Sequence, residues 1–255
     1  MGIFAGLALI EALVVTIVLI FGAVMSGVMV GRYFLKHYSA DEAPPVGSLV
    51  AALFALLAFL LALTYSTTSN RFEERKQLLL DEVNAIGTAY LRADFIDSNA
   101  WRTESKELLK SYVALRANVV DQEADIGFIL ERSEVLHKEL WRIAVNAVRA
   151  NRDPAHLAYA TSLNDVIDLH TSRVVVALKY HIHHTVWLVL MTVSVLSMFA
   201  MGFQFGYGGG RRVMLCFVLA LTFSLVLMMI EDLDRPLEGT ITVDNQPLAE
   251  LLKTM

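Results

Sequence analysis

Three acidic residues, Glu231, Asp232 and Asp234, directly follow the last long apolar segment of this chain. Hard cations such as Ca²⁺ bind several carboxylate and carbonyl oxygens that converge from one short loop. The acidic cluster is therefore a candidate Ca²⁺ site. The alternative is structural, because the same carboxylates would pair with Arg235 or with basic residues at the ends of other helices.

A histidine-rich stretch, 180–184, is the second group whose chemistry matters. His181 and His184 are three residues apart and would share one helical face. Imidazole binds metal ions and titrates near neutral pH, but two ligands without a carboxylate at matching spacing make a poor metal site. Metal binding and pH sensing therefore stand beside a third interpretation, an ordinary histidine cluster at a membrane surface.

The sequence contains no catalytic motif. It has no phosphate-binding loop, no nucleophile elbow and no His-Glu-x-x-His run. The glycine-rich stretch 206–210 is followed by two arginines, which is typical of a tight turn. The single cysteine, Cys216, cannot form an intramolecular disulfide. We expect a protein that is not an enzyme and that binds no cofactor other than the candidate Ca²⁺.

Four apolar segments must position the acidic cluster and the histidines. They form two pairs, one near each end of the chain. Each segment has about 18–20 residues, enough for a helix to cross a ~30 Å hydrocarbon core. A helix also satisfies its own backbone polar groups, which a bilayer requires. The segments are Leu13–Gly31, Val46–Tyr65, Val186–Gly206 and Val213–Ile230.

This pattern predicts an all-α membrane protein with four transmembrane helices in two pairs and a helical aqueous domain between the second and third. The predicted divisions are a first helix pair (1–66), a helical extramembrane domain (67–185), a second pair (186–230) and a C-terminal segment that packs on the helical domain (231–255).

The amino-acid composition also indicates a protein that lies in a lipid bilayer. Hydrophobic residues make up 56% of the chain and charged residues 18%, against about 45–50% and about 25% in soluble proteins. The net charge of −5 argues against nucleic acid as a partner. Because residues 1–10 carry no positively charged side chain, we interpret the first apolar run as a permanent span rather than a cleaved signal peptide.

Between the span pairs, apolar residues recur at helical spacing. The second span is predicted to continue as one rod to a break at Asp97–Asn99, where Ser98 or Asn99 caps the next helix. Further helices are predicted to about Asp121, over Glu123–Asn151, and from Pro154 unbroken through His184 into the third span. Strand-like alternation is limited to Thr240–Val243.

Small residues at steps of three and four mark one face of each of the first two spans. They are Ala23, Gly27 and Gly31 on the first, and Ala51, Ala55, Ala58 and Ala62 on the second. Such stripes allow helix backbones to approach closely. They indicate either packing within one subunit or a subunit interface beside a pore. On the second span, Leu57, Leu61 and Tyr65 form an alternative stripe at steps of four, a candidate pore lining that would gate by dewetting.

Polar residues recur on the elements that flank the spans. They are Glu82, Asn84 and Arg92 on the first rod, Asp168 and Arg173 on the last, and Asp234 and Arg235 after the fourth span. Buried charges persist only when they are paired. This set therefore predicts an ion-pair network that fastens the C-terminal segment to the helical domain, or else a polar vestibule for ions.

Several of these residues lie in stretches that resemble a bacterial family of bestrophin-like membrane proteins of unknown function. The stretches are Arg-Phe-Glu-Glu-Arg (71–75), Asp-Glu-Val-Asn-Ala-Ile-Gly-Thr-Ala-Tyr-Leu-Arg (81–92), Leu-Asn-Asp-Val-Ile-Asp-Leu-His-Thr-Ser-Arg (163–173) and Asp-Leu-Asp-Arg-Pro-Leu-Glu-Gly (232–239). More distantly, the order of spans and helical domain resembles the bestrophin channels.

The resemblance implies a pentameric homo-oligomer in the bacterial inner membrane that conducts inorganic ions along the second span. It also implies a cytoplasmic helical domain, an orientation that the flanking basic residues alone leave open. In bestrophins a Ca²⁺ clasp follows the fourth span, where Glu231, Asp232 and Asp234 stand here. The alternative function is a membrane-anchored sensor or scaffold whose helical domain binds a partner; a continuous central opening would separate the two.

Overall fold

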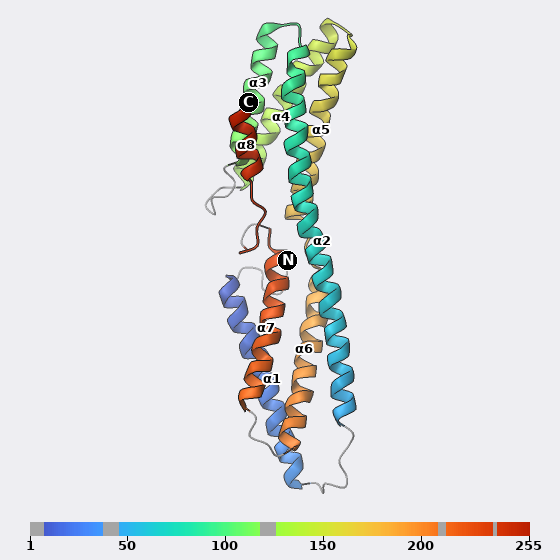
Figure 1. Cartoon of the computed structure of the whole chain (residues 1–255), viewed down its shortest axis with the longest axis vertical. Helices are drawn as coiled ribbons and strands as arrows, with labels where there is room; N and C mark the ends of the chain where they lie inside the picture. The colour runs from blue at the N-terminus through green and yellow to red at the C-terminus, as the bar shows by residue number, and fades with distance from the viewer. Residues whose placement is uncertain (1–7, 38–45, 118–125, 209–212, 237–238) are drawn as a thin grey trace. The chain divides into compact units, whose positions relative to one another are not determined.

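The computed structural model describes residues 8–37, 46–117, 126–208, 213–236 and 239–255, and all the regular secondary structure in them is helical (Figure 1). The elements are α1 (Leu9–His37), α2 (Val46–Arg92), η2 (Ala93–Phe95), α3 (Asn99–Ala117), α4 (Ile126–Ala150), α5 (Pro154–Leu178), α6 (His184–Tyr207), α7 (Val213–Asp234) and α8 (Gln246–Thr254). The all-α prediction is confirmed.

Four of the helices are long and apolar enough to cross a membrane: α1, α2, α6 and α7. Each contains one of the four apolar segments of the sequence. The continuous rod predicted from the second segment is also confirmed, because α2 runs for 47 residues before the short η2 turn ends it. The chain folds into two compact units, one made from residues 1–71 and 181–241 and the other from 72–180 and 242–255.

In the first unit, α1 and α6 pack with their backbones in direct contact. A Cβ atom added at Gly27 would lie 2.1 Å from the carbonyl oxygen of Phe199, and one added at Gly202 would lie 2.0 Å from that of Val24. Gly31 and Gly206 repeat this reciprocal contact one turn further on. The small-residue stripe of the first span therefore serves packing within the subunit, where glycine allows close approach.

In the second unit, α2, α3, α4, α5 and α8 surround one apolar core. Its fully buried side chains include Ile86 of α2, Tyr112 of α3, Ile143 of α4 and Leu248 of α8. Local signals set where these helices begin. Ser98 Oγ accepts the Trp101 N–H at 3.4 Å before α3, and the Asp153 carboxylate accepts the Ala155 N–H at 2.8 Å before α5.

Two local predictions were wrong. The helix predicted to run unbroken through His184 ends at Leu178, and α6 begins only at His184. The Asp234 carboxylate explains the break, because its two oxygens accept the Ile182 N–H at 3.0 and 3.1 Å. Thr240–Val243 is not a strand, since no described segment pairs with it. The predicted helix bounds at Asp121 and Glu123, and part of the 206–210 turn, lie outside the described residues.

Replacing Gly27 with alanine should force α1 and α6 apart, because the new methyl group would overlap the Phe199 carbonyl. We expect the free energy of unfolding to fall by about 1–3 kcal/mol, the usual cost of overpacking, measured by thermal unfolding in detergent. Gly22→Ala is the matched control on the same helix, since a Cβ there meets nothing within 4 Å. Equal stability of the two variants would contradict the close packing.

Candidate functional site

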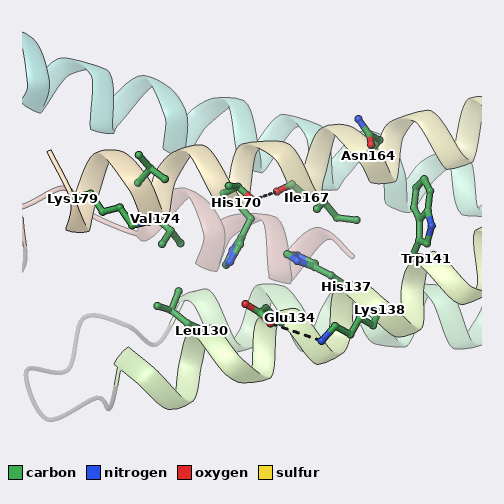
Figure 2. Close-up of a pocket in the computed structure, with 12 residues that line it drawn as sticks. Leu130, Glu134, His137, Lys138, Trp141, Asn164, Ile167, His170, Val174 and Lys179 are labelled. Carbon is green, nitrogen blue, oxygen red and sulfur yellow. Dashed lines mark hydrogen bonds and ion pairs between the residues drawn. The ribbon is translucent and has the colours of Figure 1, made fainter.

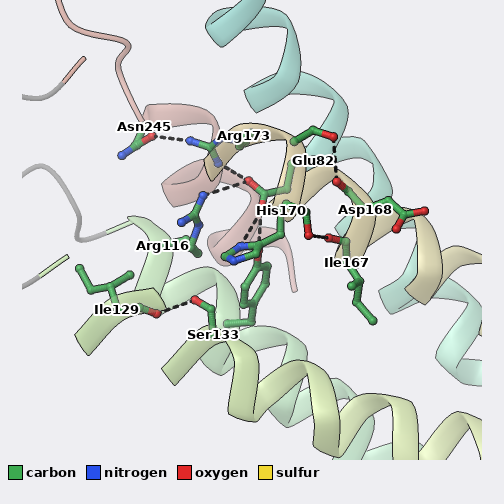
Figure 3. A network of polar contacts seen from close by, with 12 residues as sticks. Glu82, Arg116, Ile129, Ser133, Ile167, Asp168, His170, Arg173 and Asn245 are labelled. Atoms are coloured by element: carbon green, nitrogen blue, oxygen red, sulfur yellow. Dashed lines mark hydrogen bonds and ion pairs between the residues drawn. The ribbon is translucent and has the colours of Figure 1, made fainter. Parts of the chain in front are cut away.

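The second unit is organised around one buried carboxylate, Glu82 of α2, whose side chain has no solvent exposure. Arg173 of α5 forms an ion pair with its Oε2, and Arg116 Nη2 of α3 lies 3.7 Å from the same oxygen. Figure 3 shows both guanidinium groups directed at the Glu82 carboxylate. Arg173 also donates to Asn245 Oδ1 at 3.4 Å, which connects the residue preceding α8 to the cluster.

The other carboxylate oxygen of Glu82, Oε1, connects the cluster to a group of aromatic rings. Tyr112 donates its hydroxyl proton to Oε1, and the same hydroxyl lies 3.0 Å from His170 Nδ1. Because an ionised carboxylate only accepts, the Tyr112 proton goes to Glu82, and Nδ1 of His170 must carry the hydrogen of the second bond. The His137 ring stacks edge-on at 4.8 Å from the His170 ring.

Electrostatics set the charge state of this cluster. Burial alone would raise the pKa of Glu82, but attraction to Arg173 and Arg116 and hydrogen bonds from Tyr112 and Arg173 hold it below its usual value. Burial lowers the pKa of His137 to about 4. Burial, together with Arg116, lowers the pKa of His170 to about 3. At neutral pH the site therefore combines one carboxylate, two guanidinium groups and two neutral imidazoles.

Of the polar residues predicted to form one network, the structure joins Glu82 to Arg173 and leaves the others elsewhere. Asn84 and Asp168 are exposed, and Asp168 accepts a hydrogen bond from the side chain of Asn164. Arg92 donates to the carbonyl oxygen of Ala158 at 3.1 Å.

Asp234 and Arg235 belong to the first unit, and their contacts differ from the ones predicted. Arg71 Nη1 lies 3.5 Å from the Asp234 carboxylate, whereas the predicted network would have paired Asp234 with the helical domain. Arg235 pairs with Glu231 at 3.1 Å, four residues earlier on the same chain. The local chain around the last span, rather than the helical unit, therefore takes up these charges.

The carboxylates of the acidic cluster contact groups of the protein itself. Each of its carboxylates has its own neighbour: Glu231 pairs with Arg235, Asp232 accepts the Thr240 N–H at 2.6 Å, and Asp234 accepts the Ile182 N–H. In the part of the chain that the structure describes, no three His, Cys, Asp or Glu side chains converge as metal ligands would. His181 makes a hydrogen bond from Nδ1 to the Asp234 carbonyl oxygen at 3.2 Å, consistent with a structural role for that histidine.

The three candidate pore residues do not share one exposed face. Leu57 and Leu61 have 0% and 7% exposure and pack in the core of the first unit, whereas Tyr65 is 42% exposed. The sequence showed a stripe at steps of four but not which way it faces. The small-residue stripe of the second span, Ala51, Ala55, Ala58 and Ala62, is exposed along its whole length.

Sequence reasoning missed five members of the Glu82 cluster: Arg116, Tyr112, His137, His170 and Asn245. Tyr112 has the apolar spacing of an inward-facing residue, but nothing in the sequence indicates that its hydroxyl meets a carboxylate. His170 lies in the stretch 163–173 that carries the family resemblance, three residues before Arg173 and therefore on its helical face. This spacing is the one feature of the sequence that could have placed His170 in the cluster.

Comparisons with known proteins agree with the fold. A family model described as the bestrophin-like domain matches residues 18–248. A solved structure, described as the crystal structure of a membrane protein, has a TM-score of 0.66 and 13% sequence identity, covering 96% of this chain and 95% of that one. At this identity the second comparison shows the fold alone. No curated protein matches the sequence.

Glu82→Gln should destabilise the protein strongly, because it leaves the buried Arg116 and the partly buried Arg173 beside a neutral side chain. We expect a loss of about 3–5 kcal/mol in the free energy of unfolding, the cost of breaking a buried ion pair. Chemical denaturation in detergent measures it. Asp168→Asn removes an exposed carboxylate and should change stability by less than about 0.5 kcal/mol. Similar effects of the two substitutions would disprove the central role of Glu82.

Stability should fall as the pH drops from 7 to 5. Unfolded histidines take up protons near their ordinary pKa of 6.5, whereas folded His137 and His170 resist protonation down to about 4 and about 3. Their contribution is complete above pH 6.5 and is lost below it, by roughly 1.4 kcal/mol per pH unit for each histidine. Denaturation at several pH values measures the slope.

The matched variants identify the origin of that slope. His137→Phe should remove about half of the dependence, while His184→Phe, at an exposed position outside the cluster, should leave it unchanged. A parent protein with the same stability at pH 7 and pH 5 would show that the buried imidazoles do not resist protonation.

Proposed function

Because the chain belongs to the bestrophin-like family, we propose that this protein is an oligomeric ion channel. In this proposal α1, α2, α6 and α7 all cross the membrane, and the helical unit forms an aqueous vestibule. The channel would lie in the bacterial inner membrane with the vestibule in the cytoplasm. Inorganic ions would pass along a central axis surrounded by identical subunits, five of them if the resemblance to bestrophins extends that far.

The proposal depends mainly on how little of the α2 surface is covered by the rest of the subunit. Only 17% of the residues in its apolar window are buried within the subunit, against 33% for α1, 39% for α6 and 33% for α7. Helices in a membrane associate through packing and polar contacts rather than through a hydrophobic drive. The span with the most uncovered surface is therefore the one best placed to contact other subunits or a pore.

The uncovered surface of α2 has two different faces. One is the small-residue stripe that contains Ala55 and Ala62, which suits close approach to a neighbouring helix. The other is bulky and apolar, with Leu56, Phe59 and Leu63 at steps of three and four and each about half exposed or more. We place the bulky face at the axis, because a constriction that gates by dewetting needs large apolar side chains.

The sensor or scaffold function remains the second candidate. It is favoured by the open groove between α4 and α5, a concave surface on which a partner could bind. An ion-flux measurement separates it from a channel.

Replacing Phe59 or Leu63 with serine should raise ion flux in reconstituted vesicles, because a polar side chain at an apolar constriction favours its wetting. We expect an increase of about tenfold or more, which corresponds to about 1.4 kcal/mol on the conduction barrier. Flux through vesicles loaded with a halide-sensitive dye and, separately, a cation-sensitive dye would measure it.

Leu188→Ser on α6 is the control, since this leucine is as exposed as those on α2 but lies on another span. It should leave the flux unchanged. Unchanged flux in every variant at an exposed position of α2, with correctly assembled protein, would refute the pore and favour the scaffold.

A further inference from the structure

An open groove of about 640 Å³ lies between α4 and α5. This volume falls within the range of roughly 300–1,000 Å³ that is usual for small-molecule sites. Its walls are mainly aliphatic, from Leu130, Ile167, Val174 and Val175, and the aromatic ring of Trp141 stands at one end. Figure 2 shows the imidazole rings of His137, from α4, and His170, from α5, projecting toward one another between the two helices.

The two histidines place polar nitrogens midway along this groove. Nδ1 of His170 is occupied by Tyr112, which leaves the lone pair on Nε2 as an acceptor. Nε2 of His137 is buried and has no hydrogen-bond partner among the described residues. A polar atom that loses water without gaining a partner is costly, so a bound donor that pairs with Nε2 of His170 would gain free energy.

Charge restricts what that group can be. Both imidazoles are neutral at pH 7, as their lowered pKa values require. The charged side chains Glu134 and Lys138 lie on the rim and face each other at 3.8 Å. Lys179 is the remaining charged side chain of the lining and lies at the surface. The floor therefore offers hydrogen bonds and apolar surface rather than an opposite charge.

We propose that the groove between α4 and α5 binds an uncharged aromatic molecule that carries a hydroxyl group. The hydroxyl donates to Nε2 of His170. The aromatic body packs on Ile167, Val174 and Trp141, where ring stacking adds to the burial of apolar surface. The site belongs to the helical unit alone and does not depend on ion conduction.

Three fluorinated probes test this proposal on the full chain in detergent by ¹⁹F NMR: 6-fluoro-2-naphthol, its methyl ether and 6-fluoro-2-naphthoate. The naphthol should bind about tenfold more tightly than the ether, which cannot donate a hydrogen bond. Equal affinity of these two probes would overturn the proposal. So would tighter binding of the naphthoate, because Lys179 rather than the histidines would then select the ligand.

Matched variants separate binding to the groove from partition into detergent. Val174→Trp fills the groove and should weaken naphthol binding more than tenfold, while Val135→Trp, at an exposed position of α4 outside the lining, should not change it. Unchanged binding in Val174→Trp would overturn the proposal. A second result would also overturn it: the parent protein binds no probe, and Val174→Trp changes the mass of the oligomer. The groove would then be a contact between subunits.

His170→Phe isolates the acceptor. In this variant the naphthol and its ether should bind equally, because the lone pair that distinguishes them is gone. A preference for naphthol that persists would contradict the assigned role of His170. The probe series on the parent protein and the Val174→Trp comparison decide the proposal even where His170→Phe does not fold.

Discussion

The helical unit depends on keeping one fully buried carboxylate charged. Glu82 has no exposure, and an unpaired charge at such a site costs several kcal/mol. The fold meets this cost with Arg116 from α3, Arg173 from α5 and the Tyr112 hydroxyl. Arg116 and Tyr112 come from α3 and Arg173 comes from α5, so the requirement to pair Glu82 fixes α2, α3 and α5 against one another.

The same cluster determines the properties of its surroundings. One carboxylate between two guanidinium groups leaves a net positive charge, which adds to burial in keeping His170 neutral. The neutral imidazoles then form the floor of the groove between α4 and α5. The link from Arg173 to Asn245 extends the influence of the cluster to the residue before α8. A structural ion pair and a candidate ligand site thus share one polar network.

Much of the fold follows from the sequence because hydrophobic length and helical spacing are local properties. The four spans, the long α2 rod and a cap at Ser98 or Asn99 were predicted in this way. The break between α5 and α6 was not, since it depends on the Asp234 carboxylate reaching Ile182 from 52 residues further along the chain. The partners of Glu82 were mostly missed for the same reason: Arg116 and Tyr112 lie on a helix whose rotation a single sequence does not give. The rotation of α2 likewise decides that Leu57 is inside while Phe59 is outside.

The central functional claim is that α2 lines an axis shared by several copies of the chain, and electron cryo-microscopy of the protein in lipid nanodiscs tests it most directly. We predict a closed cyclic assembly in which α2 is the span nearest the axis and Leu56, Phe59 and Leu63 face a continuous opening. A monomer, or an assembly in which the bulky face of α2 contacts lipid and no opening crosses the membrane, would contradict the claim.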